Sequence, residues 1–168
     1  MNANEILSKG NRVELTTNQN VTFMERALAL ANKSVVAGNH PFGALIVLDG
    51  KIVLEAENTV NSDSDLTRHA EMNAIAQSCS LLNEIERGRS ILFTSTEPCA
   101  MCAGALYWAG IKIVVYGCSA KRLDEIAGAS LVCHSRTVFD GAVNSPKVYG
   151  PLLEDAAAAQ HLSYWPSL

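Results

Sequence analysis

Two short motifs, His69-x-Glu71 and Pro98-Cys99-x-x-Cys102, constrain the fold of this chain more than any other feature of its sequence. Together they offer one imidazole and two thiolates, which are common protein ligands of zinc, and they leave the fourth position of a tetrahedral site open. An open position can hold water, whose pKa zinc lowers to about neutrality. The chain must therefore fold so that the two motifs meet, and their meeting predicts a catalytic zinc site.

The spacing within the motifs predicts a role for each side chain. Cys99 and Cys102 are three residues apart, so they share one helix face and can reach the same ion. Pro98 is well suited to the first turn of that helix, where the positive end of the helix dipole favours thiolate over thiol. His69 opens a second predicted helix and offers a nitrogen ligand. Glu71, two residues later, points in another direction and is predicted to transfer protons without binding the metal.

A structural zinc site is the alternative interpretation, and it requires a fourth protein ligand. No second ligand pair at short spacing follows the motifs, and an intact Glu71 speaks against a non-catalytic zinc module that only supports a dimer. We interpret the three remaining cysteines, Cys79, Cys118 and Cys133, as small buried hydrophobic residues. The spare ligand candidates are His40, His134, His161, Cys79, Cys118 and Cys133.

Length and composition predict one domain over residues 1–168. With 168 residues, 48% of them hydrophobic, the chain is long enough to bury a core of its own. No apolar run reaches the length of a membrane span, and residues 1–20 lack the apolar stretch of a signal peptide. Five cysteines form an odd set, which disfavours a disulfide framework. We therefore expect a cytoplasmic protein that does not insert into a membrane.

The charge balance favours a small-molecule substrate. The net charge is −4, and Lys121-Arg122 is the densest basic pair in the sequence. Nucleic-acid binding depends on clustered positive charge, so nucleic acid is disfavoured as a partner.

Hydrophobic periodicity and turn residues predict alternating helices and strands. A hairpin followed by β-α-β crossovers implies a mixed sheet with helices on its faces. Right-handed crossovers place the two motif-bearing helices on the same side, with both motifs at one end of the sheet. The predicted helices are 21–36, 67 or 69 to about 82, 98–110, 121–126 and 152–164, and the predicted strands are 43–48, 52–56, 90–94 and 112–117.

About residues 38–128 resemble the cytidine deaminase superfamily, most closely its bacterial guanine deaminase branch and more distantly the bacterial tRNA adenosine deaminases. The resemblance implies a three-layer α/β/α fold with a mixed five-stranded sheet and a homodimer. It also implies Zn²⁺ held by His69, Cys99 and Cys102, with Glu71 as proton shuttle. The matching segments are Pro41-Phe42-Gly43-Ala44, Asn58, Asp65-Leu66-Thr67-Arg68-His69-Ala70-Glu71 and Thr96-Glu97-Pro98-Cys99-Ala100-Met101-Cys102-Ala103-Gly104-Ala105.

The resemblance also implies a set of substrate contacts. Asn58 matches the asparagine that hydrogen-bonds the base in the family, and Trp108 matches an aromatic residue that packs on the purine. His40 precedes a turn that borders the site in relatives, and Tyr164 is a candidate lid residue, with packing of the last helix on the core as the alternative. The full predicted set is Asn58, Trp108, Phe42, Ala70, His40 and Tyr164.

Three departures from the guanine deaminase pattern leave the substrate open. Residues 122–129 lack the Phe-Asp-Asp element of that family, Leu66 replaces a usual proline, and Arg68 replaces a usual alanine. The sequence therefore predicts a zinc-dependent hydrolytic deaminase of a free nucleobase, nucleoside or related amino-heterocycle, with a guanine-like purine favoured. A tRNA-specific adenosine deaminase is the alternative.

Overall fold

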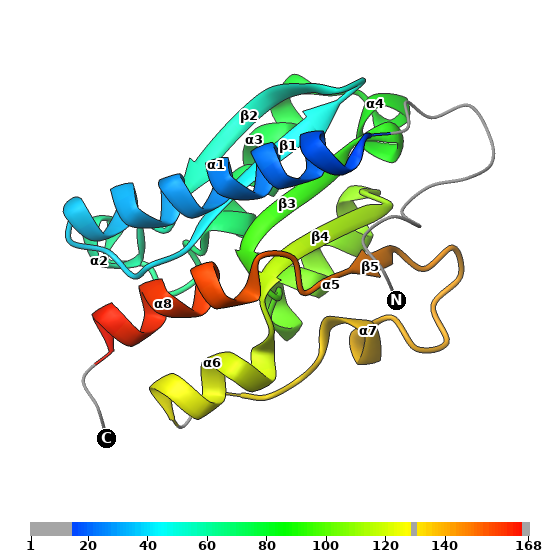
Figure 1. The fold of residues 1–168 in the computed structure, drawn as a ribbon. Helices are drawn as coiled ribbons and strands as arrows, with labels where there is room; N and C mark the ends of the chain where they lie inside the picture. The colour runs from blue at the N-terminus through cyan, green and yellow to red at the C-terminus, as the bar shows by residue number, and fades with distance from the viewer. Residues whose placement is uncertain (1–14, 129–130, 166–168) are drawn as a thin grey trace.

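A five-stranded mixed sheet forms the centre of the computed structural model, which describes residues 15–128 and 131–165 (Figure 1). The strands follow the order β2-β1-β3-β4-β5. β1 pairs antiparallel with both β2 and β3, whereas β3, β4 and β5 are parallel. The strands are β1 (Gly43–Leu48), β2 (Lys51–Glu57), β3 (Ile91–Thr96), β4 (Ile113–Cys118) and β5 (Lys147–Tyr149).

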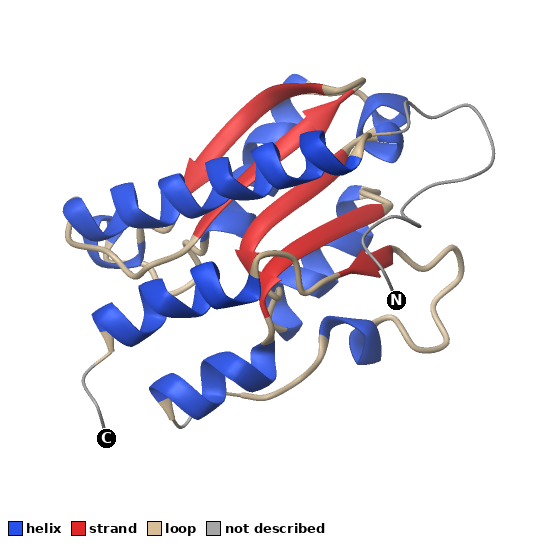
Figure 2. Ribbon diagram, viewed as in Figure 1, coloured by secondary structure: helices blue, strands red, loops and turns tan. Residues whose placement is uncertain are grey.

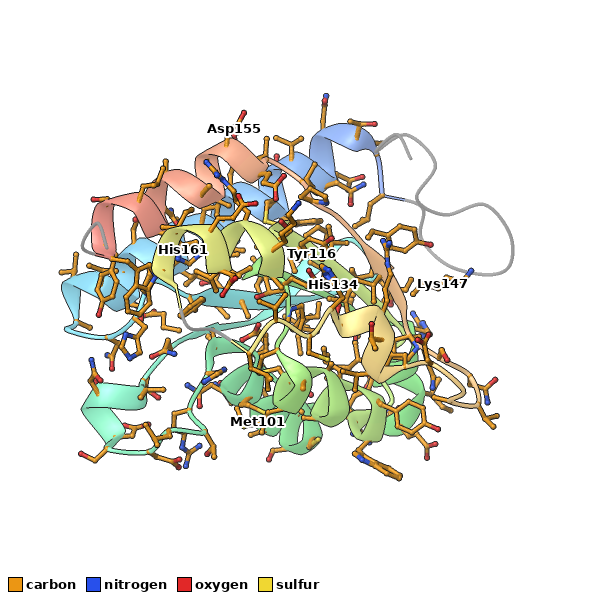
Figure 3. The ribbon with its side chains drawn as sticks, turned by 90° about the horizontal axis from the view of Figure 1, so that it is seen from below. Met101, Tyr116, His134, Lys147, Asp155 and His161 are labelled. Atoms are coloured by element: carbon orange, nitrogen blue, oxygen red, sulfur yellow. The ribbon has the colours of Figure 1, made fainter. Side chains whose placement is uncertain are left out.

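Helices cover both faces of this sheet (Figure 2). α1 and α8 lie on one side and α3 and α5 on the other, as Figure 3 shows from below. The three-layer α/β/α fold is therefore confirmed, and so is the placement of the two motif-bearing helices on one side. The helices are α1 (Thr17–Val36), α2 (Val60–Asp63), α3 (Ala70–Leu81), α4 (Glu84–Arg89), α5 (Ala100–Ala109), α6 (Ala120–Ala127), α7 (Ser135–Val138) and α8 (Glu154–Tyr164).

The apolar run of β1 is continuous because both of its faces are buried. Leu45 and Val47 pack with the buried face of α1. Ala44 and Ile46, one residue out of phase, pack with α3 and α5. The two-residue repeat of a strand thus divides one short sequence between two hydrophobic cores.

Capping residues account for the largest differences between predicted and observed helices. α1 begins four residues before the predicted start because Thr16 and Gln19 form a capping box. A second capping box, formed by Asn83 and Glu86, begins α4, which the periodicity did not indicate. α2, α7 and β5 were also missed, since elements of three or four residues are too short to show a repeat.

Gly43 allows α1 to lie directly against the start of β1. A β-carbon at this position would lie 2.4 Å from the carbonyl oxygen of Ala27 and 2.4 Å from the amide nitrogen of Ala31. Both atoms belong to the helix backbone and cannot move aside as a side chain can. The glycine therefore fixes how closely this layer of helices approaches the sheet.

We predict that Gly43→Ala lowers the free energy of unfolding by at least about 2 kcal/mol, because the added methyl group overlaps backbone atoms of α1. Urea unfolding followed by circular dichroism measures the change. The matched control is Gly88→Ala in α4, where the nearest atom that an added β-carbon would meet across the packing is the Gly110 carbonyl oxygen, at 4.0 Å. This control should raise stability by about 0.5–1 kcal/mol. Equal stability of the two variants would contradict the close approach.

Candidate metal centre and active site

Both sequence motifs lie at the N-termini of helices. His69 is the N-cap residue of α3 and Cys99 is the N-cap residue of α5, each with extended backbone angles. Cys102 lies in the first turn of α5 and is buried. Because α3 and α5 pack side by side on the same face of the sheet, their first turns bring the three side chains together.

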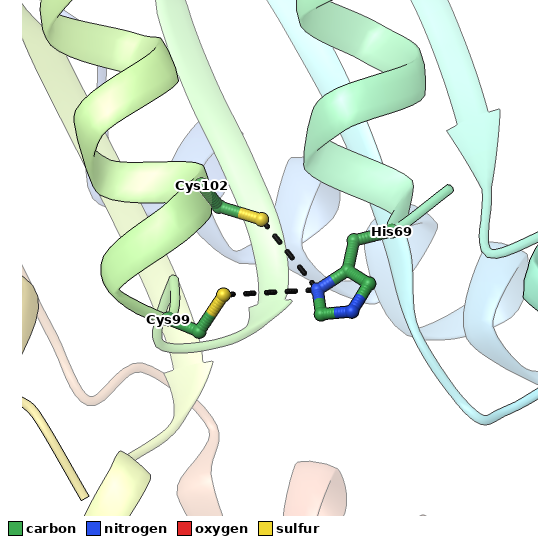
Figure 4. A group of neighbouring side chains, drawn as sticks. All are labelled: His69, Cys99 and Cys102. Carbon is green, nitrogen blue, oxygen red and sulfur yellow. Dashed lines mark hydrogen bonds between the residues drawn. The ribbon is translucent and has the colours of Figure 1, made fainter. Parts of the chain in front are cut away.

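His69 lies at the distances from both cysteines that a tetrahedral zinc site requires. His69 Nδ1 lies 3.7 Å from Cys99 Sγ and 3.6 Å from Cys102 Sγ, the two contacts dashed in Figure 4. Zn–N bonds of about 2.0–2.1 Å and Zn–S bonds of about 2.3 Å at a tetrahedral angle separate N and S by about 3.6 Å. Within the described residues, no fourth His, Cys, Asp or Glu joins this group, whose donor atoms lie within 4.8 Å of one another.

The electrostatics of the cluster favour a bound cation. Hydrogen bonds from Cys102 and His69 lower the pKa of Cys99 to about 4, which makes it a thiolate. The same hydrogen bond from Cys102, together with burial, raises the pKa of the Cys102 thiol. The hydrogen bond to Cys99 raises the pKa of His69. Metal binding therefore displaces protons from Cys102 and His69, as is usual at thiolate sites.

Glu71 lies beside the cluster and stays outside it. Its side chain is buried in the first turn of α3. Oε1 accepts a hydrogen bond from the Thr94 hydroxyl at 3.2 Å, and Oε2 lies 3.8 Å from Cys102 Sγ. Burial raises the pKa of Glu71 above its ordinary value, which suits a group that must both take and return a proton. Thr94, which the sequence analysis did not identify, fixes the orientation of this carboxyl group.

A cavity of about 420 Å³ opens onto the cluster. The metal-ligand candidates His69 and Cys99 and the carboxyl group of Glu71 form one part of its lining. The rest comes from five short segments of the chain. The other lining residues are Phe42, Leu66, Thr96, Glu97, Ala100, Met101, Ala120, Leu123, Leu131 and Cys133.

Glu97 joins three segments of the cavity wall. Its Oε1 accepts hydrogen bonds from the backbone amide and hydroxyl of Ser135 at 3.0 and 3.1 Å. Its Oε2 accepts from the Ala120 amide at 3.0 Å and contacts His134 Nδ1 at 3.3 Å. Burial alone would raise the pKa of Glu97, but these bonds hold it below its ordinary value. The carboxylate thus binds the starts of α6 and α7 to the end of β3.

The structure brings only one of the six predicted substrate-contacting residues, Phe42, into the cavity lining. Asn58 is buried, and its Oδ1 accepts a hydrogen bond from the Val60 amide. Ala70 is buried in the first turn of α3. The structure does not bring Trp108 to the cavity of its own chain: it lies near the far end of α5 and is 85% exposed.

The end of α8 packs behind the cavity wall. Tyr164 lies with its hydroxyl 3.1 Å from His40 Nδ1, and the His40 ring stacks on Trp165. One turn earlier, the buried His161 shares a 2.8 Å hydrogen bond with Thr96, which lines the cavity. His40 and Tyr164 therefore meet each other, as part of the packing of the last helix, and neither lines the cavity.

Two of the three cysteines interpreted as buried hydrophobic residues are not buried. Cys79 is exposed, and Cys133 is partly exposed and lines the cavity. That interpretation is wrong for both, and it is confirmed only for Cys118. The helical repeat that predicts which face is buried is absent around Cys133, which lies in a loop.

Comparison with known proteins identifies the family. The family model of the cytidine and deoxycytidylate deaminase zinc-binding region matches residues 17–118. The chain belongs to this family. This membership confirms the predicted resemblance and the Zn²⁺ cofactor. It also confirms the prediction of a hydrolytic deaminase that acts on an amino group of a heterocycle.

Similar proteins carry several different names. The chain is 33% identical over 153 residues to a probable cytosine deaminase of Schizosaccharomyces pombe, with 88% of this chain and 93% of that protein covered. It is 49% identical over 96 residues to guanine deaminase of Bacillus subtilis, with 56% and 62% covered. A solved structure from studies of A-to-I editing by tRNA:A34 deaminases matches with a TM-score of 0.68 and 29% identity, covering 83% and 98%.

We predict that Glu97→Gln lowers the free energy of unfolding by about 1–3 kcal/mol, because an amide nitrogen cannot accept the hydrogen bonds that one carboxylate oxygen accepts. Thermal and urea unfolding measure the loss. Glu84→Gln on α4 serves as the control, since Glu84 is exposed and should tolerate the change. If Glu97→Gln proved as stable as the unaltered protein, Glu97 would not hold the cavity wall together.

Proposed function

We propose that this chain deaminates a free nucleobase or a related amino-heterocycle, with a guanine-like purine as the favoured ring and a nucleoside as the other member of the class. The observation that carries the proposal is the position of Glu71, a buried carboxyl group beside a three-ligand metal site at the cavity. We assign the metal to His69, Cys99 and Cys102. A structural zinc site does not require a buried carboxyl group beside the metal, whereas a hydrolytic zinc site requires a group that carries protons.

The reaction replaces an amino group on an sp² ring carbon by oxygen from water and releases ammonia. When bound, Zn²⁺ supplies the Lewis acidity that makes water nucleophilic near neutral pH. Glu71 carries the two protons of the attacking water in turn, delivering the first to a ring nitrogen and the second to the departing amine, which leaves as ammonia. Thr94 holds the carboxyl group in place during both transfers. Phe42 gives the ring an apolar wall, and Asn58, Ala70 and His40 stay predicted contacts near it.

A small molecule suits this site better than tRNA. Both classes occur among the similar proteins, so the family alone does not separate them. The net charge of the chain is −4, and within the described residues no lysine or arginine lines the cavity. A polynucleotide depends on cationic contacts to its phosphates, which this cavity does not offer. The tRNA-specific adenosine deaminase is therefore the second candidate.

We also propose that the chain acts as one deaminase domain in a homodimer. Met101, Ala105 and Trp108 follow one another at helical spacing on α5, and the large side chains of Met101 and Trp108 are exposed. α5 carries no charged residue, so this stripe is a suitable surface for a second copy of the chain.

Within the described residues, no helix is both long and apolar enough to span a membrane. Thiolate ligands favour a reducing compartment, so we propose a cytoplasmic enzyme of purine metabolism.

We predict that Glu71→Gln reduces kcat by at least about 100-fold, because the amide cannot carry a proton. Zinc content should remain one ion per chain, since the three ligands are unchanged. Ammonia release from guanine, cytosine, adenine, their nucleosides and aminotriazines measures activity, and atomic absorption measures zinc. Unchanged turnover in this variant would overturn the role of Glu71. Turnover by the unaltered protein of structured tRNA alone would favour the second candidate.

We predict that Trp108→Glu weakens the dimer by at least about 30-fold, because a buried tryptophan at such an interface typically contributes 2 kcal/mol or more. Sedimentation velocity over a concentration series measures the association. Leu162→Glu on α8 provides the control, because Leu162 is exposed on the other side of the sheet. If Trp108→Glu changed the dimer affinity no more than the control does, the interface would not involve α5, and the proposal would be contradicted.

A further inference from the structure

Part of the cavity lining consists of large apolar side chains. Leu66 and Leu131 are 82% and 79% exposed, yet both side chains line the same cavity. Leu123, from α6, and Met101, from α5, complete this rim. Single exposed leucines are common on protein surfaces, but several that converge on one cavity form a binding surface for apolar groups. We call these four residues the apolar rim.

The polar groups of the cavity are largely committed to other partners. All four acceptor positions of Glu97 are occupied by Ala120, His134 and Ser135. Thr96 shares its hydroxyl with His161. Among the described lining residues, few polar side chains apart from the metal ligands are therefore free to receive the hydroxyl groups of a ribose.

No cation balances a phosphate group here. Within residues 15–128 and 131–165, no lysine or arginine is among the lining residues. Arg68, the nearest in sequence to His69, pairs with Asp65 at 3.3 Å and with Asp63 at 3.9 Å. A nucleotide would bring its charge to an apolar rim and gain no partner.

The size of the cavity exceeds what a bare ring needs. Its volume of about 420 Å³ falls in the range of sites that enclose drug-sized ligands. With the reacting amino group at Glu71, the remaining volume leaves room for a substituent on the ring, and the apolar rim forms part of its wall. Apolar substituents gain most there, because each buried methylene favours binding by about fourfold.

We propose that the substrate class is an uncharged amino-heterocycle bearing an apolar substituent, which the apolar rim selects over a ribose or a ribose phosphate. This inference rests on the proposed deaminase function and names the substrate class of the same site. Leu66 and Leu131 are its specificity-determining residues. Both side chains line the cavity, and neither takes part in the chemistry.

The test compares matched derivatives of two rings. Guanine and cytosine are each supplied as the free base, N-butyl base, nucleoside and nucleoside 5′-phosphate, with guanine butylated at N7 or at N9. The zinc-loaded protein is assayed for kcat/KM, and calorimetry on the zinc-loaded Glu71→Gln protein measures binding without turnover. In at least one ring, the N-butyl base should exceed the free base by about tenfold or more in affinity, since two or more methylenes become buried. The nucleoside should fall below the N-butyl base by tenfold, and the 5′-phosphate should not bind.

The double variant Leu66→Ser/Leu131→Ser tests how much the apolar rim contributes to binding, independently of the rest of the site. Both side chains are exposed, so folding should be unaffected. The double variant should lose about fivefold or more in affinity for the N-butyl base and less than twofold for the free base. Leu81→Ser, at the opposite end of α3 from His69, is the control and should change neither.

Binding and turnover together distinguish a failure of the proposed deaminase function from a failure of the proposed selectivity of the apolar rim. If the N-butyl base binds best and no compound is deaminated, the rim is supported and the proposed function fails. If compounds are deaminated and the nucleoside or nucleotide is preferred in both rings, the function stands and the rim proposal is overturned. Equal loss of both ligands in the double variant would also overturn it.

Discussion

The packing of α3 beside α5 on one face of the sheet is the constraint on which the rest of the structure depends. Each helix starts at the same end of the sheet, so the N-cap residues His69 and Cys99 face each other. A helix N-terminus stabilises negative charge, which favours the thiolate form of Cys99. The metal geometry is thus a consequence of how two helices leave the sheet, and Gly43 sets how closely the opposite layer approaches it.

Two carboxyl groups in one cavity illustrate how surroundings decide function. Glu71 and Glu97 are both buried, and burial pushes the pKa of each upwards. Glu71 keeps a raised pKa because burial and the nearby charge of Cys99 outweigh the hydrogen bonds that stabilise its charge, among them the one from Thr94. Glu97 has a lowered pKa because hydrogen bonds from Ala120, His134 and Ser135 stabilise its charge. The first can therefore exchange protons, whereas the second is a fixed structural anion.

Local chemistry in the sequence predicted the centre of the site but not its walls. Ligand type and spacing identified His69, Cys99, Cys102 and Glu71, because zinc chemistry restricts both. Periodicity located every strand of the sheet but the three-residue β5, and the resemblance to a family supplied the fold. The wall residues Glu97, Leu123 and Leu131 were missed as site residues since they meet only through tertiary contacts, and no local repeat marks them. Trp108 shows the converse, because a family match does not establish a contact within one chain.

The central claim is that zinc at this site has three protein ligands and keeps one position for solvent. X-ray absorption spectroscopy of the zinc-loaded protein tests it most directly. The account predicts two sulfur ligands at about 2.3 Å and two nitrogen or oxygen ligands at about 2.0–2.1 Å, with the outer-shell scattering of a single imidazole. A third sulfur ligand or a second imidazole would close the site and contradict the account. Cys133, which lines the cavity, is the candidate for a third sulfur ligand.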